Sequence, residues 1–104
     1  AIAAQWLTQF GKVAILDGFV PVRTSHNTLD LRGQRVDEAL DAADAFVDRM
    51  LRVSEPVAFV LHGHGTGALK LALRSHLSAA PHVRRAEPAG PDDGGDAFTV
   101  VWLG

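Results

Sequence analysis

The chain has 104 residues, of which 47% are hydrophobic and 21% charged, with a formal net charge of −2 and no cysteine. This length allows one hydrophobic core but not two, and no apolar run approaches the ~20 residues that span a membrane. The lack of cysteine excludes a disulfide scaffold, and with no basic-then-apolar leader we expect a cytoplasmic protein with no membrane partner. Because the chain opens with Ala1 rather than methionine, we also expect it to be part of a longer protein.

The first 27 residues carry the weakest patterns, and we interpret them as an N-terminal extension or linker before a domain over 28–104. Trp6, Leu7 and Phe10 fit the end of a preceding helix, whereas 13–16 and 19–22 fit extended segments.

The next segment predicts a strand, a helix and a second strand. Residues 28–31 alternate polar and apolar side chains, which is typical of a short strand, and this strand stops at Arg32-Gly33. Apolar residues then recur at helical spacing between 36 and 51, with acidic residues in the first turns, where the helix dipole favours them. Pro56 ends this helix, and the continuous apolar run 57–61 is typical of a buried strand.

The last third predicts a helix and two strands. The four-residue spacing of its leucines predicts a helix from about 67 to 79, closed by Pro81. We predict a short strand over 83–86, a mobile loop rich in proline and glycine over 87–96, and a final strand over 98–103.

The order β-α-β-α-β-β predicts an α/β fold with helices packed against a sheet and with ligand-binding loops beyond the carboxyl ends of its strands. The loops at Arg32-Gly33 and 62–67 should therefore meet at one edge. The predicted buried positions are Leu29, Leu31, Val36, Leu40, Ala43, Val47, Leu51, Phe59, Leu61, Leu69, Leu73, Leu77, Val100 and Leu103.

The most informative run is His62-Gly63-His64-Gly65-Thr66-Gly67-Ala68-Leu69-Lys70, which joins a predicted strand to a predicted helix. Glycines let the backbone approach a ligand closely, and the unpaired N–H groups of a first helical turn attract anions, of which phosphate is the obvious one. Two histidines on such a loop are suited to contacting phosphate or moving protons. The alternative is a tight turn without a ligand. Zinc is not expected, because the chain has no cysteine to complete a His-x-His set.

The charges are unevenly distributed. No acidic residue occurs between 56 and 86, a stretch that holds Lys70, Arg74, Arg84 and Arg85, whereas acids crowd 37–55 and 92–96. This pattern favours a basic face opposite an acidic one, although two ordinary solvated faces would give the same composition.

The pair of motifs Leu29-Asp30-Leu31-Arg32-Gly33 and His62-Gly63-His64-Gly65 resembles the hallmark L-D-x-R/H and H-G-x-G motifs of the Smr (small MutS-related) domain. The resemblance covers about residues 28–103, and the wording of the motifs is most similar to the C-terminal domain of the bacterial anti-recombination MutS paralogues. It implies a two-layer α/β sandwich with a mixed four-stranded sheet, resembling the C-terminal domain of the third bacterial translation initiation factor. It also implies nucleic-acid binding, endonuclease activity on DNA or RNA in several members, and a role in suppressing recombination and in DNA repair.

Under this resemblance the candidate catalytic residues are Asp30, Arg32, His62 and His64. Arg32 would hold phosphate and a histidine would supply a proton, while Asp30 would act as a base or as one ligand of a divalent ion. One carboxylate does not make a fixed two-metal centre, so we expect no firmly bound cofactor and at most a loosely held magnesium ion. The plainer alternatives are that Asp30 bonds the backbone of the next loop and that Arg32 is its salt-bridge partner.

The residues expected to bind nucleic-acid phosphates are Gly63, Gly65, Thr66, Gly67, Lys70, Arg35 and Arg74. The same residues would also suit a non-catalytic module that grips DNA, tRNA or ribosomal RNA, including one that acts on the ribosome, because gripping and cutting need the same phosphate contacts. A protein-interaction role for the acidic helix is a third possibility, resting on charge alone.

Overall fold

The computed structural model describes residues 22–104, so the elements expected before residue 22 lie outside the described residues. In chain order it contains β2 (Thr28–Asp30), α1 (Val36–Arg52), β3 (Val57–Leu61), α2 (Ala68–Ser78), β4 (Val83–Pro88) and β5 (Phe98–Leu103), with two short 3-10 turns, η2 (Pro91–Asp93) and η3 (Gly95–Ala97), before β5. The predicted order β-α-β-α-β-β is confirmed, and neither helix in the described part is long and apolar enough to cross a membrane.

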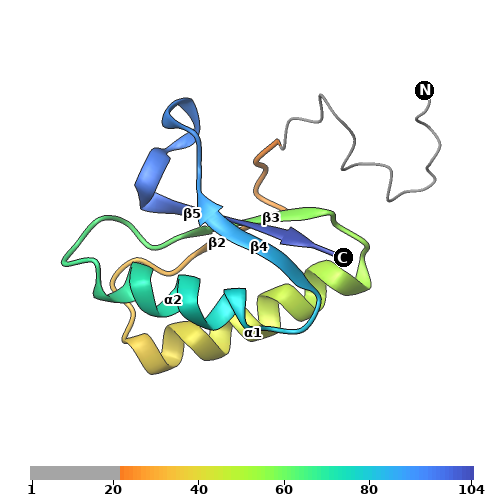
Figure 1. Cartoon of the computed structure of the whole chain (residues 1–104), viewed down its shortest axis with the longest axis horizontal. Coiled ribbons are helices and arrows are strands. Elements are labelled where there is room, and N and C mark those ends of the chain that lie inside the picture. The colour runs from red at the N-terminus through yellow and green to blue at the C-terminus, as the bar shows by residue number, and fades with distance from the viewer. Residues whose placement is uncertain (1–21) are drawn as a thin grey trace.

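The strands form one mixed four-stranded sheet in the order β2-β3-β5-β4. β2 runs parallel to β3, with Asp30 opposite Leu61, whereas β5 is antiparallel to both β3 and β4. Figure 1 shows α1 and α2 side by side on the same face of this sheet. The fold is therefore a two-layer α/β sandwich, as predicted.

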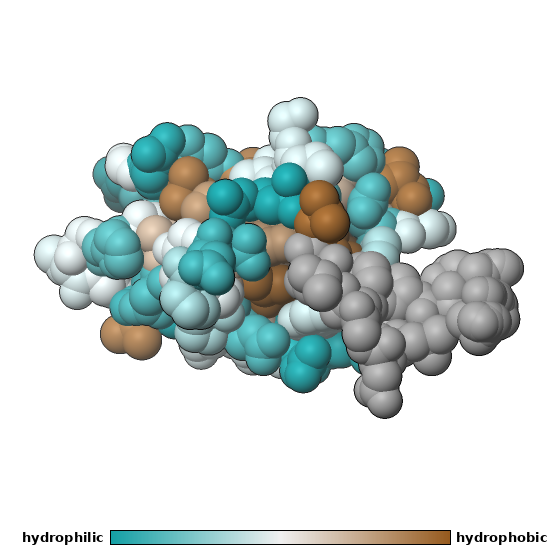
Figure 2. All heavy atoms as spheres, turned by 90° about the horizontal axis from the view of Figure 1, so that it is seen from above, coloured by the Kyte–Doolittle hydropathy of each residue, from teal (hydrophilic) through white to brown (hydrophobic). Residues whose placement is uncertain are grey.

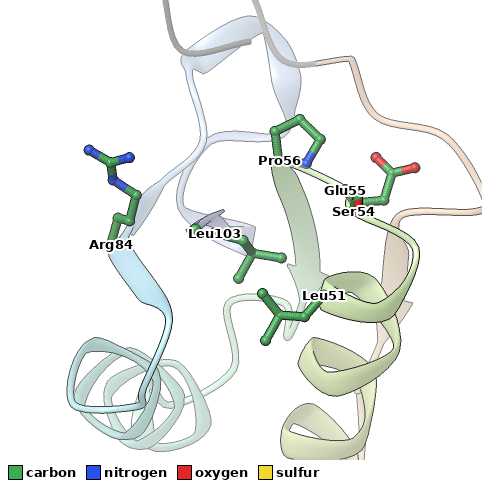
Figure 3. A pocket seen from close by; sticks show the side chains of 7 residues that line it. Leu51, Ser54, Glu55, Pro56, Arg84 and Leu103 are labelled. Atoms are coloured by element: carbon green, nitrogen blue, oxygen red, sulfur yellow. The ribbon is translucent and has the colours of Figure 1, made fainter. Parts of the chain in front are cut away.

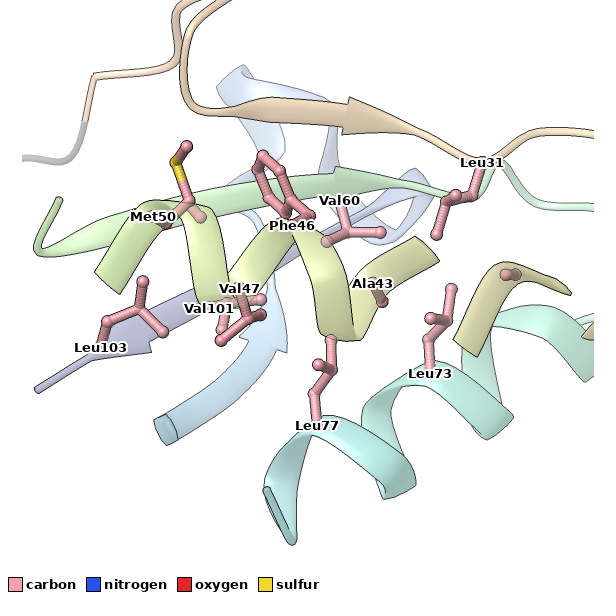
Figure 4. Close-up of a cluster of buried hydrophobic side chains, with 12 residues drawn as sticks. Leu31, Ala43, Phe46, Val47, Met50, Val60, Leu73, Leu77, Val101 and Leu103 are labelled. Atoms are coloured by element: carbon pink, nitrogen blue, oxygen red, sulfur yellow. The ribbon is translucent and has the colours of Figure 1, made fainter. Parts of the chain in front are cut away.

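The main core lies between the sheet and the two helices (Figure 4). Alternate residues of the strands, such as Val60 and Val101, point toward the helices because successive side chains of a strand lie on opposite faces. The helices contribute one buried stripe each, with Phe46, Val47 and Met50 on α1 and Leu73 and Leu77 on α2.

The other face of the sheet carries a smaller apolar cluster of Val57, Phe59, Val100 and Ala89. Figure 2 looks onto this side and shows apolar atoms near its centre, with mainly hydrophilic residues around them. Phe98 and Trp102 pack against the cluster from β5. The central strands β3 and β5 are thus apolar on both faces, which explains why 57–61 reads as a continuous apolar run.

Most predicted core positions are fully or partly buried, but Val36 is wrong, since it is 39% exposed. Val36 is the first residue of α1, and helical side chains lean toward the N-terminus, so this one extends past the end of the helix. Further apolar residues that the prediction did not include are also buried. They are Val57, Ala58, Val60 and Val101 on the strands, and Ala39, Phe46 and Met50 on α1.

Two connecting segments are held by specific contacts. Asn27, at the end of the predicted linker, is buried; its side chain accepts a hydrogen bond from Thr24 N–H and donates one to the Val22 carbonyl. Arg23 stacks over the Phe98 ring, with its guanidinium carbon 4.1 Å from the ring centre. Within the segment predicted as a loop over 87–96, β4 continues to Pro88 and the 3-10 turns follow.

Two leucines of α2 test the core assignment, because Leu73 is completely buried and Leu71 is 67% exposed. We expect Leu73→Ala to lower the free energy of unfolding by about 2–5 kcal/mol, through lost burial and the cavity left behind. Leu71→Ala, the same chemical change on the same helix, should alter it by less than about 0.5 kcal/mol. Urea unfolding of both variants measures this, and equal losses would show that the helix packs by another face.

Candidate nucleic-acid site

The two sequence motifs meet at one edge of the sheet. Because β2 and β3 are parallel, the residues after Asp30 and after Leu61 leave the sheet on the same side, and Leu31 N–H donates to the Leu61 carbonyl at 2.8 Å. A cleft of about 230 Å³ opens between the two loops, and the predicted meeting is confirmed. It is lined by Gly33, Gln34, His62, Gly63, His64, Gly65, Thr66, Gly67, Leu69 and Lys70.

The second loop depends on glycine at two places. Gly63 has φ of 78°, and a Cβ there would lie 3.5 Å from Cγ of Arg32, so the loop backbone passes close to the first motif. Gly67, with φ of 88°, precedes the first residue of α2, and its N–H donates to the His64 carbonyl. Side chains other than glycine rarely adopt such φ values. The loop therefore lines the cleft with its backbone, beside a helix start that carries no acidic residue in its first turn.

Asp30 and Arg32 form a two-pronged ion pair on the first motif. Arg32 Nε lies 3.0 Å from Oδ1 and Nη2 lies 2.7 Å from Oδ2, while the backbone N–H of Arg32 also donates to Oδ1. These bonds lower the pKa of Asp30 to about 2 and raise that of Arg32. Both of the plainer expectations, the backbone bond and the salt bridge, are present. A carboxylate with so low a pKa is a weak proton acceptor.

His62 is 6% exposed, and both of its ring nitrogens make internal hydrogen bonds. Nδ1 lies 2.9 Å from the Gly63 carbonyl oxygen and Nε2 lies 2.8 Å from Thr99 Oγ1. Burial is the main cause that lowers the pKa of His62, and the nearby charges of Arg74 and Lys70 add to it. His62 is therefore a neutral ring in the wall of the cleft.

Lys70 and Arg74 both pair with Asp96, which the sequence analysis assigned to a separate acidic segment. Asp96 pairs with Lys70 Nζ and, at 2.9 Å, with Arg74 Nη1, and these two bonds lower the pKa of Asp96 to about 2. The expectation that acidic residues lie apart from the basic segment is thus wrong at Asp96. It is also wrong at Asp44, which lies 2.8 Å from the His76 ring. The fold brings the acidic and basic segments together, which the order of charges along the sequence does not show.

The remaining predicted residues divide between the rim of the cleft and more distant positions. His64, Gly65 and Thr66 are exposed on the loop, and the Thr66 hydroxyl accepts a hydrogen bond from Ala68 N–H. Arg35 follows the rim residue Gln34 in the chain, and its Nε lies 3.4 Å from Oδ1 of Asp37. Arg84 and Arg85 are on β4, the strand at the opposite edge of the sheet from β2, and do not line the cleft.

A second pocket of about 360 Å³ lies at the opposite end of β3, between the end of α1 and the last strand (Figure 3). Its lining combines Leu51, Pro56 and Leu103 with Ser54 and Glu55, and Arg84 stands at its edge. It contains none of the residues of the two motifs. Within residues 22–104, no group of three His, Cys, Asp or Glu side chains is arranged to hold a metal ion.

A profile of the Smr domain matches residues 29–104. The chain belongs to the Smr domain family. Among its relatives, the protein named Endonuclease MutS2 from Anaeromyxobacter sp. is 52% identical over 75 residues, and that from Thermomicrobium roseum is 45% identical over 75 residues. Each match covers 72% of this chain but only 9% and 10% of those proteins, so this Smr domain spans about a tenth of the length of the curated relatives.

Two solved structures share the fold. The Smr domain of Thermus thermophilus MutS2 matches with a TM-score of 0.73 and 37% identity, covering 75% of this chain and 98% of that one. YdaL, a stand-alone small MutS-related protein from Escherichia coli, matches with a TM-score of 0.66 and 23% identity, over 77% of this chain and 66% of that one. The second likeness is one of fold alone.

The sequence analysis missed three polar residues around the cleft, namely Gln34, Asp96 and Thr99. Thr99 alone carried a signal: it is the one polar residue in the apolar strand 98–103, at a position that alternation places on the helix side with Val101 and Leu103. Asp96 sits in a turn rich in glycine and acids, where no periodicity indicates a partner.

The ion pairs of the site predict how stability depends on pH. Asp96 has a folded-state pKa of about 2 against an ordinary value of 3.8, so its stabilising effect is complete above about pH 4 and is lost as the pH falls toward 2. We expect Asp96→Asn to flatten this part of the profile, measured by urea unfolding at a series of pH values. Asp92→Asn is the matched control, because Asp92 makes no ion pair within residues 22–104. A wild-type slope in Asp96→Asn would contradict the assignment.

Proposed function

We propose that this Smr domain binds the phosphate backbone of DNA or RNA in the cleft and hydrolyses a phosphodiester bond, as the endonuclease domain of a MutS2-like protein. The observation that carries the proposal is the position of Arg32. Its guanidinium is exposed and is held in one orientation by Asp30, and its side chain lies beside Gly63 of the glycine loop that lines the cleft. A rigid arginine fork next to backbone N–H groups is an arrangement suited to phosphate.

Phosphate binding would use the donors that the internal contacts leave over. Asp30 occupies Nε and Nη2 of Arg32, and Nη1 makes no hydrogen bond within the described residues. Lys70 lines the cleft but already pairs with Asp96, so it adds less positive field than an unpaired lysine would. Arg32 would therefore make the main contact, and the loop amides would complete it.

Two histidines would act on the leaving oxygen. His64 is exposed on the loop and can reach a bound strand directly. His62 points Nδ1 at the Gly63 carbonyl in the cleft wall, so a substrate oxygen that displaces this carbonyl would accept a hydrogen bond from Nδ1–H. With its low pKa, Asp30 would act by orienting Arg32 or by holding one magnesium ion loosely, rather than as a base.

A non-catalytic gripping module is the second candidate, and it would serve a whole protein that binds DNA, structured RNA or the ribosome. It is favoured by the pairing of Asp30 with Arg32 and of Asp96 with Lys70, because neither carboxylate is left unpaired to act as a base. The catalytic candidate would act in the cytoplasm, as part of a longer MutS2-like chain. Its role would be in DNA repair and in the suppression of recombination.

Cleavage of supercoiled plasmid and of structured RNA, with and without magnesium, separates the two candidates. We expect nicking by the wild-type domain and a loss of about 100-fold or more in His62→Ala and in Asp30→Asn, the scale of a lost hydrogen-bond donor to developing charge or of a lost orienting group. His76→Ala is the matched histidine control, because His76 pairs with Asp44 on the helices and does not line the cleft.

Binding of a labelled duplex, followed by fluorescence anisotropy, completes the test. Arg32→Ala should weaken binding, whereas His62→Ala should weaken cutting more than binding. The same residual cleavage in the wild type and in all variants would indicate a contaminant. Together with unimpaired binding by the wild type, that result would replace the nuclease assignment by the gripping module.

A further inference from the structure

We propose that Thr99 is a positioning residue for His62: its hydroxyl, itself held by Arg74, donates to Nε2 and locks the ring with Nδ1–H facing the glycine loop. This inference rests on the proposed function for its consequence, since a fixed ring matters most if His62 meets the substrate. The geometry itself stands on hydrogen bonds within the described residues.

The direction of each hydrogen bond follows from what its atoms can do. A carbonyl oxygen only accepts, so Nδ1 of His62 must carry the hydrogen that points to Gly63. In a neutral ring Nε2 is then an acceptor, and the Thr99 hydroxyl must donate to it at 2.8 Å. Arg74 Nε, which can only donate, gives its hydrogen to Thr99 Oγ1 at 2.9 Å. Arg74 therefore donates to Thr99, Thr99 to His62 and His62 to Gly63, so all three hydrogen bonds point in one direction.

A doubly protonated His62 would leave the buried Thr99 hydroxyl without an acceptor. If His62 were protonated at both nitrogens, Nε2–H and Arg74 Nε–H would both donate to the Thr99 oxygen. The hydroxyl hydrogen of Thr99 would then have no acceptor among residues 22–104, and Thr99 is completely buried. An unpaired buried polar group is destabilising, so Thr99 favours the neutral ring as well as holding it in place.

Arg74 is itself anchored at three points. Besides Thr99, its guanidinium contacts the Phe98 carbonyl at 3.1 Å and Asp96 at 2.9 Å, so α2, η3 and β5 are tied together behind His62. The backbone repeats this connection, because the N–H groups of both His62 and Gly63 donate to the Ala97 carbonyl. Arg74, expected from the sequence to bind phosphate, thus makes internal contacts instead.

Three variants test the proposal. Thr99→Val keeps the shape and removes the hydroxyl, Thr99→Ser restores a hydroxyl, and Thr28→Val is the matched control on β2, where the hydroxyl bonds Thr24 and not His62. NMR of the ¹⁵N-labelled imidazole reports the state of each ring nitrogen. We expect the Nε2 resonance to shift and broaden in Thr99→Val, to return in Thr99→Ser and to stay unchanged in Thr28→Val.

Cleavage and NMR together separate this proposal from the proposed function. Thr99→Val should lower cleavage by about 10- to 100-fold with a smaller effect on duplex binding, and Thr99→Ser should restore it. An unchanged His62 spectrum in Thr99→Val would overturn the inference even if the domain cuts. The predicted spectral change in a domain that neither cuts nor binds would support the inference and overturn the proposed function. If Thr99→Val does not fold, Arg74→Lys, which removes the bond to Thr99 while keeping the charge, gives the same readout.

Discussion

The parallel pairing of β2 with β3 is the constraint on which the candidate site depends. Parallel strands leave a sheet at the same edge, so two motifs about thirty residues apart in the sequence bring Gly33, next to Arg32, and the glycine loop to one cleft. The register places Asp30 opposite Leu61. A slip of one residue would turn Leu29 and Leu31 outward and the ion pair inward, so burial of these leucines in the core also sets the position of Arg32.

The charges around the cleft are balanced internally, which changes how binding would be achieved. Each cation beside it has an acidic partner: Arg32 has Asp30, and Lys70 and Arg74 share Asp96. A nucleic acid would meet a shaped site with directed donors rather than an open basic face, in keeping with a net charge of −2. Specific geometry, more than long-range attraction, would then select the bound phosphate.

The fold was largely predictable because strand and helix periods in this chain are strong: the two helices, the central strands and the meeting of the loops follow from the spacing of leucines and glycines. The hydrogen-bond network behind the loop was not predictable. Thr99 and Asp96 act through contacts with residues 25 and 26 positions away, and only the folded arrangement of α2 against β5 brings them together. For the same reason Arg74 was assigned to phosphate, although its partners are internal.

The most direct test of the account maps where a nucleic acid contacts the domain. Amide chemical shifts of the ¹⁵N-labelled chain, followed while a short DNA duplex or a structured RNA is added, report this residue by residue. The account predicts that the largest changes fall on Gly33, Gly63, Gly65 and Gly67, with little change around the second pocket. Changes centred on Arg84 and Leu103, with the glycine loop unaffected, would contradict it.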